Sequence, residues 1–599
     1  MESVKKSYEN ITAGQCIRTI GGQVKQFTGP SILTPVAMIL EVLMETLIPF
    51  LMASIIDKGV ETGDLGHIYR IGALMILFAL LSLSAGIAGG VLAARASAGL
   101  AMNLRNAMYR NIQTFSFSNI DKYSSSGLVT RLTTDVTNIQ NAYQMLLRMC
   151  MRSPVSLLCA MGMAFFISPP LASVYLAAVV FLSIFLIFII RKTTGVFRQV
   201  FEKYDDLNAS VQENVSAIRV VKAYVREEHE KDKFNRAVQN LYGMFVRAEK
   251  LIVLNFPVMQ LTIYSCILLV SYLGARLIIQ DSLSTGELMS MLAYCMNILM
   301  NLMMLSMIFV MMTMSAASMQ RVTEVITEKS GLEDPADPIM EVKDGSIVFD
   351  HVGFGYNKTA QEQVLKEVSL SIRSGETIGI IGGTGSAKST LVSLIPRLYD
   401  VTEGSVRVGG EDVRKYSLDA LRSQVAVVLQ QNNIFTGTIL ENLRWGSGEA
   451  TEEECRRACR IACADEFIQQ MPMKYETQIE RGGTNVSGGQ KQRLCIARAL
   501  LKKPKIIIFD DSTSAVDTAT EARIRKALDE ELPGMTKLII AQRVSSVEHA
   551  DRIIVMEDGR VSGFGTHEEL LASNEIYRDV YESQTGGLKD FDSLSQGDQ

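Results

Sequence analysis

The stretch Thr377-Ile-Gly-Ile-Ile-Gly-Gly-Thr-Gly-Ser-Ala-Lys-Ser-Thr390 decides the fold of the carboxyl-terminal half of the chain. A strand-like apolar run leads into a glycine-rich turn, then Lys-Ser, then the apolar helix-like run 391–395. This succession is the context that a phosphate-binding loop requires. Backbone N–H groups are expected to hold phosphate oxygens, with Lys388 neutralising them and Ser389 ligating Mg²⁺. The predicted contacts are Gly382, Gly383, Thr384, Gly385, Ser386, Ala387, Lys388, Ser389 and Thr390.

Two downstream motifs extend this site. The run 505–511, Lys-Ile-Ile-Ile-Phe-Asp-Asp, reads as a buried strand that ends in two carboxylates. Asp510 is placed there to hold Mg²⁺ through water. Val486-Ser-Gly-Gly-Gln490 precedes an amphipathic helix, and a serine with glycine amides at a helix start makes a second anion site. Its predicted members are Ser487, Gly488, Gly489 and Gln490.

The amino-terminal half has a different composition. The 599-residue chain is 48% apolar with a mean hydropathy of +0.17, which is unusual for a soluble protein. A helix needs about 20 apolar residues to cross a hydrocarbon core of about 30 Å. Six stretches are long enough for this: 32–56, 71–94, 146–167, 171–190, 251–279 and 287–318. The sequence therefore predicts a six-helix membrane domain followed by a soluble α/β domain.

Loop charge predicts the orientation of these spans. The connection 191–250 holds twelve Lys or Arg and the connection 95–140 holds five, whereas 57–69 carries one and 280–287 none. By the positive-inside rule, both termini and both long loops are expected in the cytoplasm. The loops on the opposite side are short, so the helices are expected to extend well below the bilayer.

Charge and cysteine usage exclude other classes. The net charge is −5, so no basic field points to nucleic acid. Nine dispersed cysteines argue against a disulfide framework. Cys455, Cys459 and Cys463 follow a helical spacing of four, which favours packing on one helix face over a metal cluster.

Taken together, these motifs resemble the ATP-binding cassette (ABC) transporter superfamily, as a half-transporter of the multidrug exporter type. The resemblance implies that Tyr356 stacks on adenine and that Gln430 senses the γ-phosphate and helps to bind Mg²⁺. Asp517, in Ser514-Ala-Val-Asp517, matches the loop that crosses the dimer interface. Segments near 120–135 and 205–222 look like the coupling helices. The implied architecture is a membrane all-α six-helix exporter domain with cytoplasmic extensions, then an α/β P-loop domain with a helical subdomain.

The sequence departs from that family at three positions. Hydrolytically active members have Glu directly after the Mg²⁺-site Asp, where this chain has the shorter Asp511. They have His where this chain has Gln542, and Gly where it has Ala387, whose methyl is expected to crowd the loop. We interpret this chain as the degenerate-site half of a heterodimer, whose partner supplies an intact catalytic Glu and switch His. The alternatives are an ATP-binding gating or regulatory subunit and a slow homodimeric exporter.

The expected cofactors are ATP and Mg²⁺, and the expected cargo is a small amphipathic or apolar compound moved across a plasma (inner) membrane. The predicted boundaries are a cytoplasmic segment 1–30, a membrane domain 31–325, a linker 326–341, a nucleotide-binding domain 342–582 and a disordered tail 583–599. Glu41 and Glu45, one turn apart in the first span, read equally well as a polar spot in a translocation path or as a pair bonded to a neighbouring helix. The Met-rich sixth span is a candidate wall for varied apolar ligands.

Overall fold

The computed structural model describes residues 12–356, 363–511 and 516–584. They form two compact units. The first contains the described residues up to Gln113 together with Ser124–Glu328, and the second contains Thr114–Tyr123 together with the described residues from Lys329 onward. The short segment Thr114–Tyr123 therefore belongs to the unit that carries the nucleotide motifs, although it lies between membrane helices in the sequence.

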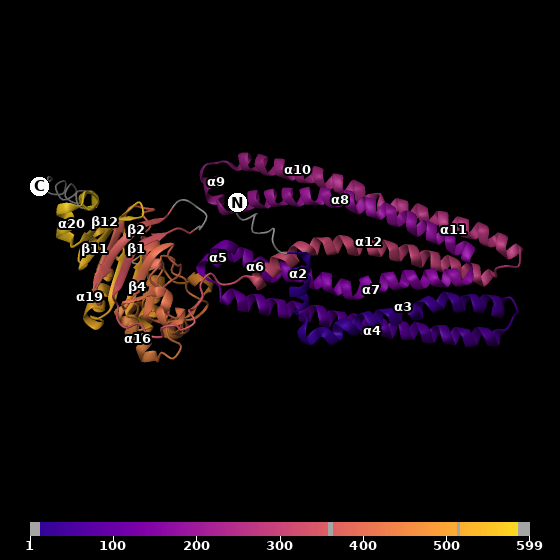
Figure 1. Cartoon of the computed structure of the whole chain (residues 1–599), viewed down its shortest axis with the longest axis horizontal. Helices are drawn as coiled ribbons and strands as arrows, with labels where there is room; N and C mark the ends of the chain where they lie inside the picture. Colours follow the sequence, from indigo (N-terminus) through magenta and orange to yellow (C-terminus); the bar gives the residue numbers. More distant parts are fainter. Residues whose placement is uncertain (1–11, 357–362, 512–515, 585–599) are drawn as a thin grey trace. The chain divides into compact units, whose positions relative to one another are not determined.

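The first unit is built from long helices (Figure 1). Within the described residues, six helical segments are long and apolar enough to cross a membrane, which confirms the six predicted spans. Several helices continue far beyond the bilayer thickness: α4 has 49 residues and α8 has 48, or about 70 Å each at 1.5 Å per residue. The helices of this unit are α2 (Ala13–Gly21), α3 (Thr28–Ile55), α4 (Leu65–Gln113), α6 (Ser125–Thr130), α7 (Val136–Ile167), α8 (Pro169–Ser216), α9 (Ile218–Ala223), α10 (Glu227–Val253), α11 (Asn255–Ile279) and α12 (Thr285–Thr327).

Buried tyrosines connect the membrane helices through backbone carbonyls. Tyr294 on α12 donates to the carbonyl of Thr46 on α3 at 2.7 Å, and Tyr175 on α8 donates to that of Met291 on α12 at 2.8 Å. A buried hydroxyl needs such a partner, so these bonds satisfy the polar atom while the rings fill the helix interfaces. Alanine, leucine, isoleucine, valine, methionine and cysteine side chains fill the rest of this core.

The described residues of the second unit form three sheets, the smallest of which pairs β7 (Gly437–Thr438) with β8 (Gln478–Ile479). The largest has the strand order β12-β11-β3-β10-β9-β6, in which β12 alone runs antiparallel to its neighbour. A four-stranded antiparallel sheet has the order β2-β1-β4-β5. The strands are β1 (Ile347–Phe354), β2 (Leu365–Ile372), β3 (Thr377–Gly382), β4 (Glu403–Val408), β5 (Glu411–Asp412), β6 (Val425–Val428), β9 (Ile506–Asp510), β10 (Thr536–Ile540), β11 (Arg552–Glu557) and β12 (Arg560–Gly565).

A helical subdomain is inserted between β6 and β9. Its helices include α15 (Ile439–Arg444), α16 (Glu452–Ile461) and α18 (Gly488–Leu501). Cys455, Cys459 and Cys463 are buried in its core, as the packing interpretation of their spacing predicts. The carboxyl ends of the parallel strands β3, β10, β9 and β6 meet at one edge of the large sheet, which is where such folds bind their ligands.

Candidate functional site

The phosphate-binding loop follows β3 and leads into α13 (Lys388–Ser393), as predicted. The Lys388 ammonium donates to the carbonyl oxygens of Gly382 at 2.7 Å and Gly383 at 2.8 Å, so the loop wraps around the positive charge. Burial lowers the pKa of Lys388, and the nearby Asp511 and Asp510 carboxylates oppose that shift. The arrangement brings a cation and the backbone of a glycine-rich loop together where an anionic phosphate chain can lie.

The backbone of this loop requires left-handed conformations. Gly385 has φ +86°, and a Cβ on Gly382 would lie 2.3 Å from the Met556 carbonyl oxygen, so both positions need glycine. Ala387 also lies in the left-handed region, at φ +71° and ψ 23°. Its methyl packs against the apolar core of the domain. The departure at Ala387 thus places conformational strain in the loop.

Two of the three residues predicted to hold Mg²⁺, Ser389 and Asp510, meet at the ends of neighbouring elements. The amide of the third, Gln430, instead donates to Asp511. The Ser389 hydroxyl donates to Asp510 Oδ1 at 2.7 Å, which brings the start of α13 to the end of β9. Burial raises the pKa of Asp510, while the bond from Ser389 and the charge of Lys388 act against this shift. A serine hydroxyl and a carboxylate are hard oxygen donors, so this pair fits a small hard cation such as Mg²⁺.

Asp511 is held by two glutamine side chains. Its Oδ2 accepts from Gln542 Nε2 at 2.8 Å and from Gln430 Nε2 at 3.3 Å. Gln542 follows β10 and Gln430 follows β6, so three strand ends bring together the three side chains that the family pattern assigns to the γ-phosphate region. Asp511 itself has φ +47°. Both amides point their donors at one carboxylate oxygen, and neither can take up a proton at neutral pH.

Gln584 supports the Gln542 segment and was not predicted. Its Nε2 donates to the Gln542 carbonyl oxygen at 3.0 Å, and its Oε1 accepts from the Val544 N–H at 2.8 Å. Gln584 falls in the segment 583–599 that the sequence assigned to a disordered tail; residues 583 and 584 are helical, and 585–599 lie outside the described residues. A lone glutamine near a chain end carries no sequence signal that could have indicated this role.

The predicted second anion site lies at the cap of α18. The Ser487 hydroxyl accepts from the Gln490 N–H at 3.3 Å, and Gln490 Oε1 accepts from the Ser487 N–H at 2.9 Å, which forms a capping box. Ser487 and Gly488 are exposed and Gly489 is half-exposed. Among the described residues, no hydrogen bond joins this cap to the phosphate-binding loop.

Asp517 and Tyr356 have separate structural partners. Asp517 caps α19 (Thr518–Glu531) by accepting from the Thr520 N–H at 2.9 Å, and this bond lowers the pKa of its carboxyl. Residues 512–515, which include Ser514 and its alanine neighbour, lie outside the described residues. Tyr356 is 53% exposed, and its hydroxyl lies 3.0 Å from that of Thr390 in α13. Its ring thus stands beside the phosphate-binding loop, as an adenine platform would.

The acidic pair in the first span is bonded to a neighbouring helix. Arg152 on α7 donates through Nη2 to Glu45 at 2.7 Å, and its Nε lies 3.5 Å from Glu41. These contacts match the interpretation of Glu41 and Glu45 as a pair bonded to a neighbouring helix. Sequence reasoning did not identify Arg152, because neither spacing nor motif relates it to α3.

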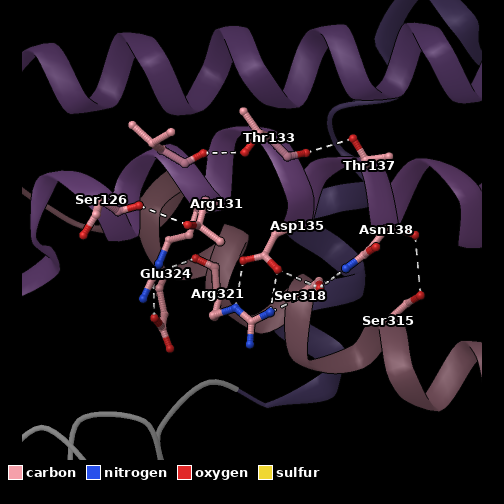
Figure 2. A network of polar contacts seen from close by, with 12 residues as sticks. Ser126, Arg131, Thr133, Asp135, Thr137, Asn138, Ser315, Ser318, Arg321 and Glu324 are labelled. Carbon is pink, nitrogen blue, oxygen red and sulfur yellow. Dashed lines mark hydrogen bonds and ion pairs between the residues drawn. The ribbon is translucent and has the colours of Figure 1, made fainter. Parts of the chain in front are cut away.

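A second polar network joins the residues just before α7 to α12 (Figure 2). Arg321 Nε donates to Asp135 Oδ2 and the Ser318 hydroxyl to Asp135 Oδ1, both at 2.8 Å. Arg131 Nη1 donates to Glu324 Oε2 at 2.9 Å. Asp135 is only 1% exposed, so its charge depends on these donors.

Comparisons with known proteins identify the family of this chain. Residues 31–303 match the family model of the ABC transporter transmembrane region, and residues 365–514 match that of the ABC transporter. YfiB, an ABC transporter ATP-binding protein of Bacillus subtilis, is 37% identical over 559 residues, 93% of this chain and 97% of YfiB. An ATP-dependent lipid A-core flippase of Desulfotalea psychrophila is 31% identical over 496 residues, 82% of this chain and 85% of the flippase.

A solved structure supports the fold. A bacterial Atm1-family ABC exporter with ATP bound superimposes with a TM-score of 0.79 at 23% identity, over 92% of this chain and 98% of that one. A six-span membrane unit joined in one chain to a P-loop ATPase unit defines an ATP-driven membrane transporter. The chain belongs to the ABC transporter family, as a half-transporter with an ABC exporter fold.

Proposed function

We propose that this chain is the degenerate-site subunit of a heterodimeric ABC exporter that moves amphipathic or apolar compounds out of the cell by alternating access. The observation that carries the proposal is the Asp511 carboxylate, which two glutamine amides hold at 2.8 and 3.3 Å. A general base must reach the attacking water and accept its proton. Here the carboxylate is one methylene short and already accepts two hydrogen bonds.

Gln542 removes the second part of the hydrolytic machinery. An imidazole can share a proton with a phosphate oxygen, whereas a neutral amide can only donate or accept a hydrogen bond. A displacement of 1 Å in such a site can lower a rate about 100-fold, so the two departures together predict slow hydrolysis at this chain's own loop. Binding of ATP and Mg²⁺ remains expected, because Lys388, Ser389 and Asp510 retain their roles.

The partner would use this chain's intact second anion site. Family members sandwich two ATPs between two cassettes, so each site takes its loop and carboxylate from one subunit and its Ser-Gly-Gly-Gln motif from the other. The exposed Ser487 cap at the start of α18 is suited to a nucleotide held by a partner with an intact Glu and His. We place both termini in the cytoplasm and the spans in the plasma membrane.

The test is ATP turnover by the full chain alone in lipid nanodiscs. We expect tight Mg-ATP binding with turnover well below about 1 per second, the lower end of ordinary enzyme rates. Asp511→Glu alone should leave turnover slow because Gln542 remains. Asp511→Glu combined with Gln542→His should raise it about 100-fold, the order that a positioned acid–base pair contributes. Asp511→Asn is the matched control and should bind ATP as the parent does.

Three outcomes would contradict the proposal. Turnover above about 1 per second by the parent chain would indicate a working homodimer. Full hydrolysis by Asp511→Glu alone would show that Gln542 does not contribute to the slow hydrolysis. ATP-driven uptake into inverted vesicles by a partner half-transporter without this chain would favour a gating or regulatory role.

A further inference from the structure

An aromatic cluster surrounds the expected adenine platform. The Tyr356 and Tyr399 rings lie edge to face, with centroids 5.2 Å apart and planes at 89°. Phe354, at the end of β1 and nearly fully buried, contacts Tyr356 at 4.9 Å and Tyr399 at 5.7 Å between centroids. Tyr399 therefore fixes one side of the Tyr356 ring. Sequence motifs did not single out Tyr399.

The other side of Tyr399 contacts α5 (Phe117–Tyr123), which belongs to the same compact unit. The Tyr399 hydroxyl donates to Asp121 Oδ2 at 2.8 Å, and the Phe117 ring packs against Tyr399 at 6.1 Å between centroids. Phe117 and Asp121 are four residues apart and so share one face of α5. Burial and the Asp121 carboxylate raise the pKa of Tyr399, so the hydroxyl remains a donor at neutral pH.

We propose that Tyr399 is a positioning residue that links adenine stacking on Tyr356 to the docking of α5. Its ring supports Tyr356, and its hydroxyl holds Asp121. A base that stacks on Tyr356 restricts the positions of that ring, and the restriction passes through the Tyr399 ring to the hydrogen bond with Asp121. Linkage is reciprocal, so docked α5 must also favour ATP.

The consequence follows from the chain connectivity. α5 directly follows α4, one of the long membrane helices, in the sequence. If Tyr399 changes the docking of α5 when a base binds Tyr356, it also acts on the connection between the membrane helices α4 and α7, to which α5 belongs. The inference rests on ATP binding at this chain's own loop, and it is independent of hydrolysis at Asp511.

Two variants separate the ring from the hydroxyl. Tyr399→Phe keeps the ring and removes the bond to Asp121, whereas Tyr399→Leu removes both. The matched control is Tyr475→Phe. The Tyr475 hydroxyl likewise donates to an aspartate, Asp465, at 2.7 Å, but it does so in the core of the helical subdomain and not in the aromatic cluster around Tyr356. The full chain in nanodiscs is used throughout, and the probes are ATP and inorganic tripolyphosphate, which lacks the base.

Hydrogen exchange of residues 117–123 measures docking, and equilibrium binding measures the base contact. In the parent, ATP should slow exchange in this segment and tripolyphosphate should not. Tyr399→Phe should lose the ATP-dependent slowing while binding ATP within about twofold of the parent. Tyr399→Leu should also bind ATP about fivefold more weakly, in line with the loss of one aromatic contact, with tripolyphosphate binding unchanged.

Two results would overturn the proposal. In the first, ATP still slows hydrogen exchange of residues 117–123 in Tyr399→Phe; in the second, Tyr475→Phe loses this effect of ATP as fully as Tyr399→Phe does. If Tyr399→Leu does not fold, Tyr399→Phe alone decides the question. Failure of this experiment leaves the turnover of the Asp511 and Gln542 variants unaffected, so the two proposals are tested separately.

Discussion

Ala387 has a left-handed backbone conformation that is unfavourable for a residue with a Cβ. It adopts φ +71° with a Cβ, a conformation that strains an L-residue by about 1–2 kcal/mol. Ala387→Gly removes that strain but adds about 0.5–1 kcal/mol of chain entropy to the unfolded state, so we expect a net stabilisation of about 0.5–1 kcal/mol. Fluorescence of Trp445, the chain's one tryptophan, follows unfolding of this domain.

The control for this prediction is Ala522→Gly, an exposed position inside the right-handed helix α19. Glycine there should lower the unfolding midpoint, since it costs about 1 kcal/mol in a helix interior. If Ala387→Gly lowers the midpoint by a similar amount, the loop carries no strain at this position.

The family resemblance predicted which side chains share the site around Asp511 but not the hydrogen bonds between them. The motif order placed Asp511, Gln430 and Gln542 in one site, because all three follow parallel strands of one sheet. Their hydrogen bonds depend on side-chain conformations that neither motif nor spacing specifies. The same holds for Gln584 and Tyr399, whose partners lie far away in the sequence.

At the scale of elements, the network of Figure 2 ties α12 to the segment before α7. Arg321→Met removes the main partner of a carboxylate that is 1% exposed. An uncompensated buried charge costs about 3–5 kcal/mol, and since Arg321 is itself 42% exposed we expect about 3 kcal/mol. A dye that fluoresces on reacting with buried thiols such as Cys266 and Cys295 reports unfolding of this unit.

Adding Asp135→Asn to Arg321→Met removes the stranded charge and should recover most of the loss. Lys233→Met is the exposed control, because Lys233 pairs with Glu213 at 2.7 Å on the surface of the same unit and its loss should leave the midpoint unchanged. Equal midpoints for the single and double variants at the network would show that Asp135 is stabilised by its other neighbours.

The length of the apolar stretches located all six spans, because a bilayer imposes a minimum helix length that is visible in composition. The hydrogen bonds and ion pairs between helices could not be predicted from apolar length. Arg152 lies about 110 residues from Glu41 and Glu45, and Asp135 lies nearly 190 from Arg321, so only the packing of α7 against α3 and α12 relates them. Sequence order also assigned Thr114–Tyr123 to the membrane half, whereas that segment packs with the nucleotide-binding unit.

The orientation of the whole molecule remains a prediction from loop charge, and cysteine labelling tests it. We expect Thr62→Cys, in the turn between α3 and α4, to react with a membrane-impermeant maleimide in intact cells. Tyr224→Cys, next to α9 and 76% exposed, should react only after permeabilisation. The parent provides the background, since its nine cysteines are all buried or half-buried. We expect this pattern because the twelve Lys and Arg of 191–250 make translocation of the Tyr224 loop costly. The opposite labelling pattern would indicate an inverted topology, with the ATP site outside the cell, where no ATP is supplied.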